Sequence, residues 1–165
     1  MEWLRSTLEY LRGANFAATA FRLFMAMLFG GIIGLERGRR RRPAGFRTHI
    51  LVCMGAALAM CISQYIAVTL GQTTDISRLG AQVINGIGFL GAGTIVVTGR
   101  QQVKGLTTAA GLWASACMGL AIGAGYYECA VIACITIFLT ITALNNVEKL
   151  LTSRTRNMNI NVTLG

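Results

Sequence analysis

Long apolar stretches separated by short polar segments dominate this chain. Five of them approach the roughly 20 residues that a helix needs to cross the hydrocarbon core of a bilayer. They cover residues 16–35, 50–70, 76–97, 106–124 and 129–144. The pattern predicts an all-α integral membrane protein whose transmembrane domain, residues 16–144, holds five transmembrane helices.

The two ends of the chain have different patterns. In residues 1–15, apolar side chains recur at helical spacing among charged ones, which predicts a leader helix at the membrane interface. In the tail, residues 145–165, apolar and polar side chains alternate from Met158 to Leu164, as in a half-buried strand. Because a lone strand is unstable, we interpret the tail as the start of a truncated α/β domain, or as a strand that pairs with another chain.

The composition supports a membrane protein. Of the 165 residues, 54% are hydrophobic and 13% are charged, about half the charged share of a soluble domain. The mean hydropathy is +0.58. The segments outside the apolar stretches are too short to fold a soluble catalytic domain, which argues against an enzyme of that kind.

Basic residues set the expected orientation. The net charge is +9, and six arginines fall between positions 37 and 47, in the loop after the first apolar stretch. Short loops rich in Lys and Arg stay in the cytoplasm. This rule puts the N-terminus in the periplasm and the C-terminus in the cytoplasm, with eleven basic residues on the cytoplasmic side and two on the other. We expect no nucleic-acid partner, since topology accounts for the charge.

The five cysteines all lie in apolar stretches and form no C-x-x-C pair. The sequence therefore indicates neither a disulfide framework nor a zinc site.

The third apolar stretch carries the most informative polar residues. Arg78, Gln82 and Asn85 lie at positions i, i+4 and i+7, so they share one helical face. Polar groups in hydrocarbon are costly unless they meet partners or line a wet cavity. We therefore predict that this face points into the bundle and forms an intramembrane polar site, to which Thr107 and Thr108 of the fourth stretch contribute.

The same stretch is rich in glycine, and residues 86–91 match G-x-G-x-x-G. A dinucleotide site is excluded, because that fingerprint needs a preceding strand and a later acidic residue. Two interpretations stay open: close helix packing, or a local break that exposes carbonyl groups to a cavity. The glycines concerned are Gly86, Gly88, Gly91 and Gly93.

Polar residues also gather at the predicted cytoplasmic mouth, namely Glu36, Arg37, Arg47 and Thr48. Glu36 either pairs with a neighbouring arginine or places a carboxylate at the mouth of a cavity. The adjacent run of Arg39, Arg40, Arg41 and Arg42 is suited to anionic lipid head groups or to an acidic protein partner.

Three more polar residues have open or local roles: Arg22, Asp75 and His49. Arg22 either snorkels outward or faces inward as a candidate functional residue. Asp75 and Arg78 form an i, i+3 pair at a helix start. His49 is interpreted as a polar anchor at the interface rather than a metal ligand.

Several sequence blocks together resemble the MgtC/SapB family of bacterial inner-membrane proteins, over about residues 28–127. The blocks are Gly34-Leu35-Glu36-Arg37, Ala44-Gly45-Phe46-Arg47-Thr48-His49, Ser77-Arg78 through Ala81-Gln82, the glycine run of residues 86–93, and Gly105-Leu106-Thr107-Thr108-Ala109-Ala110 with Leu112-Trp113. The resemblance implies four or five spans in the bacterial inner membrane. It also implies a role in growth at low magnesium and, in pathogens, in virulence through survival inside host cells.

These observations give two main functional hypotheses. The first is a transporter-like conduit for Mg²⁺. We expect no cofactor, and Mg²⁺ is the one candidate ligand. The absence of carboxylates within the spans and the presence of Arg78 weigh against a cation. The second is a non-transporting regulator that binds another membrane complex, such as the ATP synthase or a cation pump. In either case small-residue faces favour a homo-oligomer, and no catalytic constellation is present.

Overall fold

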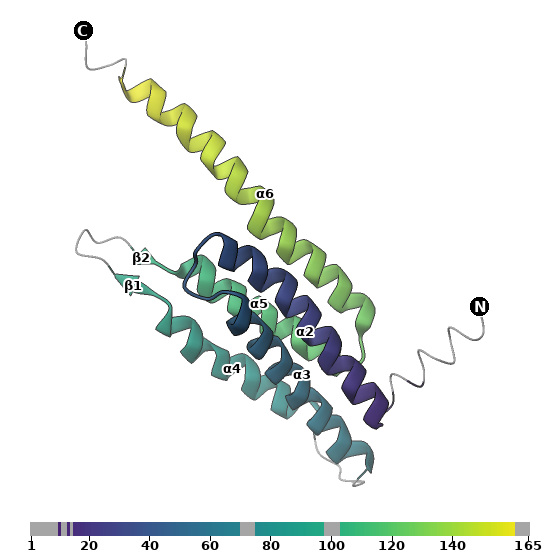
Figure 1. Cartoon of the computed structure of the whole chain (residues 1–165). Coiled ribbons are helices and arrows are strands. Elements are labelled where there is room, and N and C mark those ends of the chain that lie inside the picture. Colours follow the sequence, from purple (N-terminus) through teal and green to yellow (C-terminus); the bar gives the residue numbers. More distant parts are fainter. Residues whose placement is uncertain (1–9, 11–12, 14, 70–74, 98–102, 161–165) are drawn as a thin grey trace, which may run out of the picture.

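The computed structural model of the chain describes residues 10, 13, 15–69, 75–97 and 103–160. Helices make up most of this part, and a short β-hairpin interrupts them (Figure 1). The elements are α2 (Phe16–Arg39), α3 (Phe46–Thr69), α4 (Ser77–Gly93), β1 (Val96–Val97), β2 (Val103–Lys104), α5 (Leu106–Gly123) and α6 (Tyr127–Ile160).

The helices run alternately up and down, since short connections join them. The bundle therefore has a loop end, which carries the α2–α3 loop and the hairpin, and an opposite end, where α2 begins and α5 stops (Figure 1). Helix α3 packs against α2, α4 and α5, and α5 also contacts α6. Helix α4 thus lies on one side of the bundle, and α6 lies on another, against α2 and α5. The C-terminal part of α6 extends past the loop end (Figure 1).

Local chemistry fixes where the helices begin. The Asn15 side chain accepts a hydrogen bond of 2.7 Å from the Ala18 amide, which caps the start of α2. Gly105 connects the hairpin to α5 with a φ of +100°, and a Cβ there would overlap the Thr94 carbonyl. Only glycine meets both demands at that position.

Glycines allow α3 to approach its neighbours backbone to backbone. On the α2 side, a Cβ at Gly30 or Gly34 would lie 2.8 Å from a carbonyl oxygen of α3. On the α5 side, a Cβ at Gly119 or Gly123 would overlap the carbonyl oxygens of Cys53 and Ala57. The three helices therefore leave no room between them at these levels.

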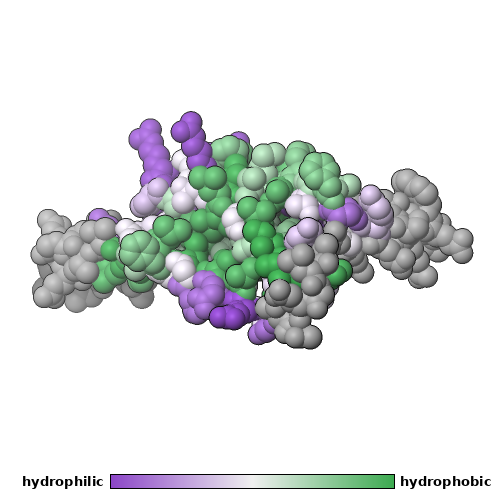
Figure 2. Space-filling model, turned by 90° about the horizontal axis from the view of Figure 1, so that it is seen from below, coloured by the Kyte–Doolittle hydropathy of each residue, from purple (hydrophilic) through white to green (hydrophobic). Residues whose placement is uncertain are grey.

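The surface fits a membrane environment. Large apolar side chains are exposed along the helices, including Phe16 at 90% and Phe89 at 84%, and the face in Figure 2 is mostly hydrophobic between polar patches. Three helices are long and apolar enough to cross a bilayer: α2, α3 as far as Val68, and α5. The apolar part of α6, Tyr127–Ala143, and the 17-residue α4 are shorter. The chain is therefore a helical membrane protein, whose five-span count and orientation stay predictions.

Two predicted segments differ from the structure. The third apolar stretch ends as a helix at Gly93, and Val96–Val97 pairs antiparallel with Val103–Lys104 instead of continuing a span to residue 97. β-Branched residues that find a partner strand favour this hairpin. Met158 to Ile160 belong to α6, so the predicted strand is wrong for them: within the described residues no partner strand adjoins them. Residues 161–165 and almost all of the leader lie outside the described residues.

The close approach at Gly119 predicts a sharp contrast between two glycine-to-alanine substitutions. Gly119→Ala should lower the free energy of unfolding by about 1–3 kcal/mol, because its methyl group overlaps the α3 backbone. Gly55→Ala, on the exposed side of α3 with nothing within 4 Å, should be neutral or stabilising by up to about 1 kcal/mol. Denaturant titration in micelles measures both, and equal effects would contradict the packing.

Candidate functional site

Two buried arginines connect α2 with α5, one near each end of the bundle. Arg22 is 1% exposed and Arg37 is 3% exposed. They lie 15 residues apart on α2, or about 22 Å along the helix axis. Because a buried guanidinium needs hydrogen-bond acceptors, each arginine fixes the helices that supply them.

At the loop end, Arg37, His49 and Thr108 form a buried polar cluster, and the buried Ser115 lies on the same face of α5 as Thr108, seven residues further along. The Arg37 Nη2 atom donates a hydrogen bond of 2.7 Å to Thr108 Oγ1, across 71 positions of sequence. His49 and Ser115 are both fully buried. Three polar atoms of these residues, Arg37 Nε, His49 Nε2 and Ser115 Oγ, have no hydrogen-bond partner among the described residues.

His49 is not the interfacial anchor that its sequence position suggests. Its Nδ1 atom lies 3.0 Å from the Gly45 carbonyl oxygen, which can only accept, so Nδ1 carries the proton. The unprotonated Nε2 atom faces α5, where a Cβ added at Gly111 would lie 3.7 Å from it. Sequence reasoning assigned Thr108 to the α4 polar site and did not connect it with His49. The i, i+3, i+7 spacing of Thr108, Gly111 and Ser115, which places them on one face of α5, is the signal that could have found this group.

At the opposite end, Arg22 faces inward, as one of the two sequence-based interpretations proposed. It donates to Gln64 Oε1 at 2.6 Å, to the Gly123 carbonyl at 2.9 Å and to the Tyr127 hydroxyl at 3.3 Å. The Tyr127 ring also meets Phe21 edge to face. Arg22 thereby joins α2 to α3, α5 and α6.

The predicted polar face of α4 is exposed at the surface of the chain. Arg78, Gln82 and Asn85 are all exposed, so the prediction that they face the interior is wrong for the single chain. Helix α4 contacts the rest of the bundle along a narrow strip, and the only residues that it buries are Gly80, Ile87 and Gly91. The polar residues lie outside this strip.

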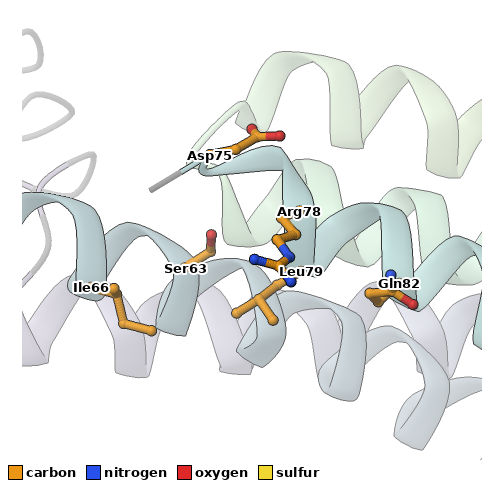
Figure 3. A pocket seen from close by; sticks show the side chains of 6 residues that line it. All are labelled: Ser63, Ile66, Asp75, Arg78, Leu79 and Gln82. Carbon is orange, nitrogen blue, oxygen red and sulfur yellow. The ribbon is translucent and has the colours of Figure 1, made fainter. Parts of the chain in front are cut away.

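A surface pocket of about 400 Å³ lies beside this face, between α4 and the end of α3. Figure 3 shows Ser63 and Ile66 of α3 opposite Arg78 and Gln82 of α4, with Asp75 just before the helix. The amide and hydroxyl of Ser77 donate to Asp75 Oδ1 at 2.9 and 2.7 Å. These hydrogen bonds, together with the nearby Arg78 charge, lower the pKa of Asp75, which stays ionised at neutral pH.

Thr107 and Thr108 do not join the α4 residues. They begin α5 at the loop end, whereas Arg78 begins α4 at the opposite end. Thr108 belongs to the buried polar cluster, and Thr107 is exposed in a groove of about 260 Å³ between α5 and α6. One chain therefore does not assemble the predicted five-residue intramembrane site.

The glycine run forms no break, because α4 is helical through Gly93. Only Gly91 of the four predicted glycines packs closely, with a Cβ position 3.4 Å from the Ala109 Cβ. A Cβ at any of the other three would meet no atom within 4 Å.

The loop end carries a basic surface. Glu36 forms an ion pair with Arg40, which favours the pairing interpretation of this carboxylate. Arg47 and Thr48 are exposed in the first turn of α3, and Arg39, Arg41 and Arg42 are exposed nearby. The described residues contain no group of three or more His, Cys, Asp or Glu side chains that could hold a metal ion. What this end offers chemically is positive charge.

Comparison with known proteins gives consistent matches. The model of the MgtC family matches residues 23–150, from α2 into α6. Putative magnesium transporter YhiD of Escherichia coli (strain K12) is 40% identical over 147 residues, which are 87% of this chain and 66% of YhiD. Protein SrpB of Synechococcus elongatus is 36% identical over 155 residues, 86% of this chain and 82% of SrpB.

Protein MgtC of Brucella abortus (strain 2308) is 46% identical over 123 residues, 74% of this chain and 49% of that protein. The chain therefore spans about two thirds of YhiD and half of Brucella MgtC. No solved structure matches the chain.

The Arg37–Thr108 contact predicts unequal effects of two neighbouring substitutions. Thr108→Val keeps the shape of the side chain but removes the acceptor from a buried guanidinium, and should cost about 1.5–3 kcal/mol of unfolding free energy. Thr107→Val changes an exposed residue in the same turn and should cost less than about 0.5 kcal/mol. Denaturant titration in micelles compares them; a Thr108→Val protein as stable as Thr107→Val would rule out the proposed contact.

Proposed function

The chain belongs to the MgtC family, and from this premise we propose that it acts in Mg²⁺ homeostasis, or in adaptation to low Mg²⁺, in the bacterial inner membrane. Its helical membrane fold supports this proposal, as does its similarity to proteins named MgtC and putative magnesium transporter. We assign no catalytic step to it.

We propose further that the chain regulates another membrane component and does not conduct Mg²⁺ through its own bundle. The observation that carries this proposal is the contact of the α3 backbone with α2 and α5 at Gly34, Gly119 and Gly123. Mg²⁺ holds its water shell tightly and needs a wide, oxygen-lined path. Backbone contact at several levels opposes such a path, and the buried charges of Arg22 and Arg37 repel a cation near both ends.

The basic surface at the loop end is the part best suited to meet a partner. Arg39, Arg41 and Arg42 are exposed, and Arg37 adds charge beneath them. An acidic surface of another membrane complex, such as the ATP synthase or a cation pump, would complement this end. Anionic lipids would be attracted by the same charges.

A second candidate function is a conduit between copies of the chain. The exposure of Gln82 and Asn85 favours it, because amides from several copies could line a shared path. Arg78 on the same face disfavours a cation there.

The two functions predict opposite results in a flux assay. For the regulator, purified protein in liposomes that contain a Mg²⁺-sensitive dye should give the same Mg²⁺ entry as empty liposomes. A known Mg²⁺ channel in the same lipid provides the positive control. Saturable entry that depends on the protein would overturn the regulator and support the conduit.

Charge at the loop end should decide partner binding. Replacing Arg39, Arg41 and Arg42 together by Gln should abolish both growth at low Mg²⁺ and capture of a stoichiometric partner from membranes. The matched triple replacement by Lys keeps the charge and should preserve both. Thiol labelling verifies that both variants insert in the native orientation, since loop charge also sets topology. Full growth of the Gln variant would contradict a docking role for this surface.

A further inference from the structure

Helix α4 carries a face that no other described element covers. Ala81, Asn85, Gly88 and Ala92 recur at i, i+4, i+7 and i+11, and all four are exposed. Gln82 flanks this stripe on the same side of the helix. The contacts of α4 with α3 and α5 instead use Gly80, Val83, Ile87 and Gly91. We call the uncovered stripe the outer face of α4, and include Arg78 and Gln82, which lie at its edge beside the pocket between α3 and α4.

Gly88, the one glycine of this face, has no packing role among the residues that the structure describes. An added Cβ at Gly88 would meet no atom within 4 Å, whereas one at Gly119 would overlap the backbone of α3. A glycine inside a helix costs about 1 kcal/mol relative to alanine, and this cost is not offset by any contact of Gly88 in the single chain. Small residues at four-residue spacing are what a second helix needs to approach closely in a membrane.

The amides give a second, independent reason for a neighbour. Asn85 lies in the middle of α4, and Gln82 one turn earlier, on a helix whose other exposed side chains include Phe89 and Leu90. Amides surrounded by hydrocarbon are costly unless they find hydrogen-bond partners. Lipid tails provide none, so this face is expected to be covered by protein.

We propose that a second copy of the chain covers this face, with α4 packed against α4 about a two-fold axis along the membrane normal. Such an axis brings residues of equal depth together. An amide carries both a donor and an acceptor, so Asn85 can pair with the Asn85 of the other copy, and Gln82 likewise. Gly88 and Ala81 permit the short distance that this pairing requires.

Charge complementarity favours an identical partner over a different one. Asp75 and Arg78 lie one turn apart and are both exposed. In a two-fold pair, Arg78 of each copy reaches toward Asp75 of the other, so both charges are compensated at once. A uniformly acidic or uniformly basic partner would compensate only one of them.

This inference goes beyond the regulatory role and does not rest on it. It also bears on the conduit, because amides that pair with each other across a close contact do not line an aqueous path. A close α4–α4 contact is thus compatible with a non-conducting protein.

Disulfide cross-linking in native membranes tests the contact directly. Gly88→Cys should form a covalent product of twice the 17.7 kDa of the chain on mild oxidation. The control is Ile135→Cys, because Ile135 of α6 is also exposed and has apolar neighbours. This variant should give no more dimer than the wild-type chain, which has five cysteines of its own. Equal dimer from both variants would overturn the proposal, and so would a product of another mass from Gly88→Cys.

The strength of association tests the amides. Energy transfer between labelled copies in liposomes should show a dissociation constant about 5- to 30-fold higher for Asn85→Leu than for wild type. Asn85→Gln keeps the amide and should recover most of the difference. Unchanged association of Asn85→Leu would overturn the role of the amide pair. Neither measurement depends on Mg²⁺ or on partner capture, so each can fail while the regulatory proposal stands.

Discussion

The contact of the α3 backbone with the helices on both of its sides is the constraint on which the rest of the structure depends. Gly30 and Gly34 remove side chains between α2 and α3, and Gly119 and Gly123 do so between α3 and α5. The three helices consequently approach one another backbone to backbone at these four levels, which opposes a water-filled path between them. The remaining helices attach to its outside, α6 along α2 and α5, and α4 along α3 and α5.

The polar residues divide into two sets around that core. Arg22 and Arg37 are buried and use their hydrogen bonds to connect α2 with α5 at two levels. Arg78 and Asn85, by contrast, lie on the side of α4 that the chain leaves uncovered. Inward polar groups therefore connect the helices of one chain, while outward ones are available to the second copy that we propose.

The sequence predicts much of the fold and less of the site. The lengths of the apolar stretches located the helices α2 to α6 of the described residues, although α6 continues past its apolar stretch to Ile160. The helical spacing of Arg78 and Asn85 placed them correctly on one face of a helix. That spacing does not show whether the face meets another helix, water or lipid. The burial of His49 was missed because exposed residues, Arg47 and Thr48, precede it. The Arg37–Thr108 contact joins positions 71 residues apart, which no local pattern relates.

Water access to the core tests the account most directly. Ser115→Cys places a thiol on the buried face of α5, and Arg47→Cys places one on the exposed loop end. In intact and in inverted membrane vesicles, a charged thiosulfonate should leave Ser115→Cys unmodified from both sides while it modifies Arg47→Cys from one. Modification of Ser115→Cys at a rate near that of Arg47→Cys, with protection by Mg²⁺, would reveal a hydrated path and contradict the closed core.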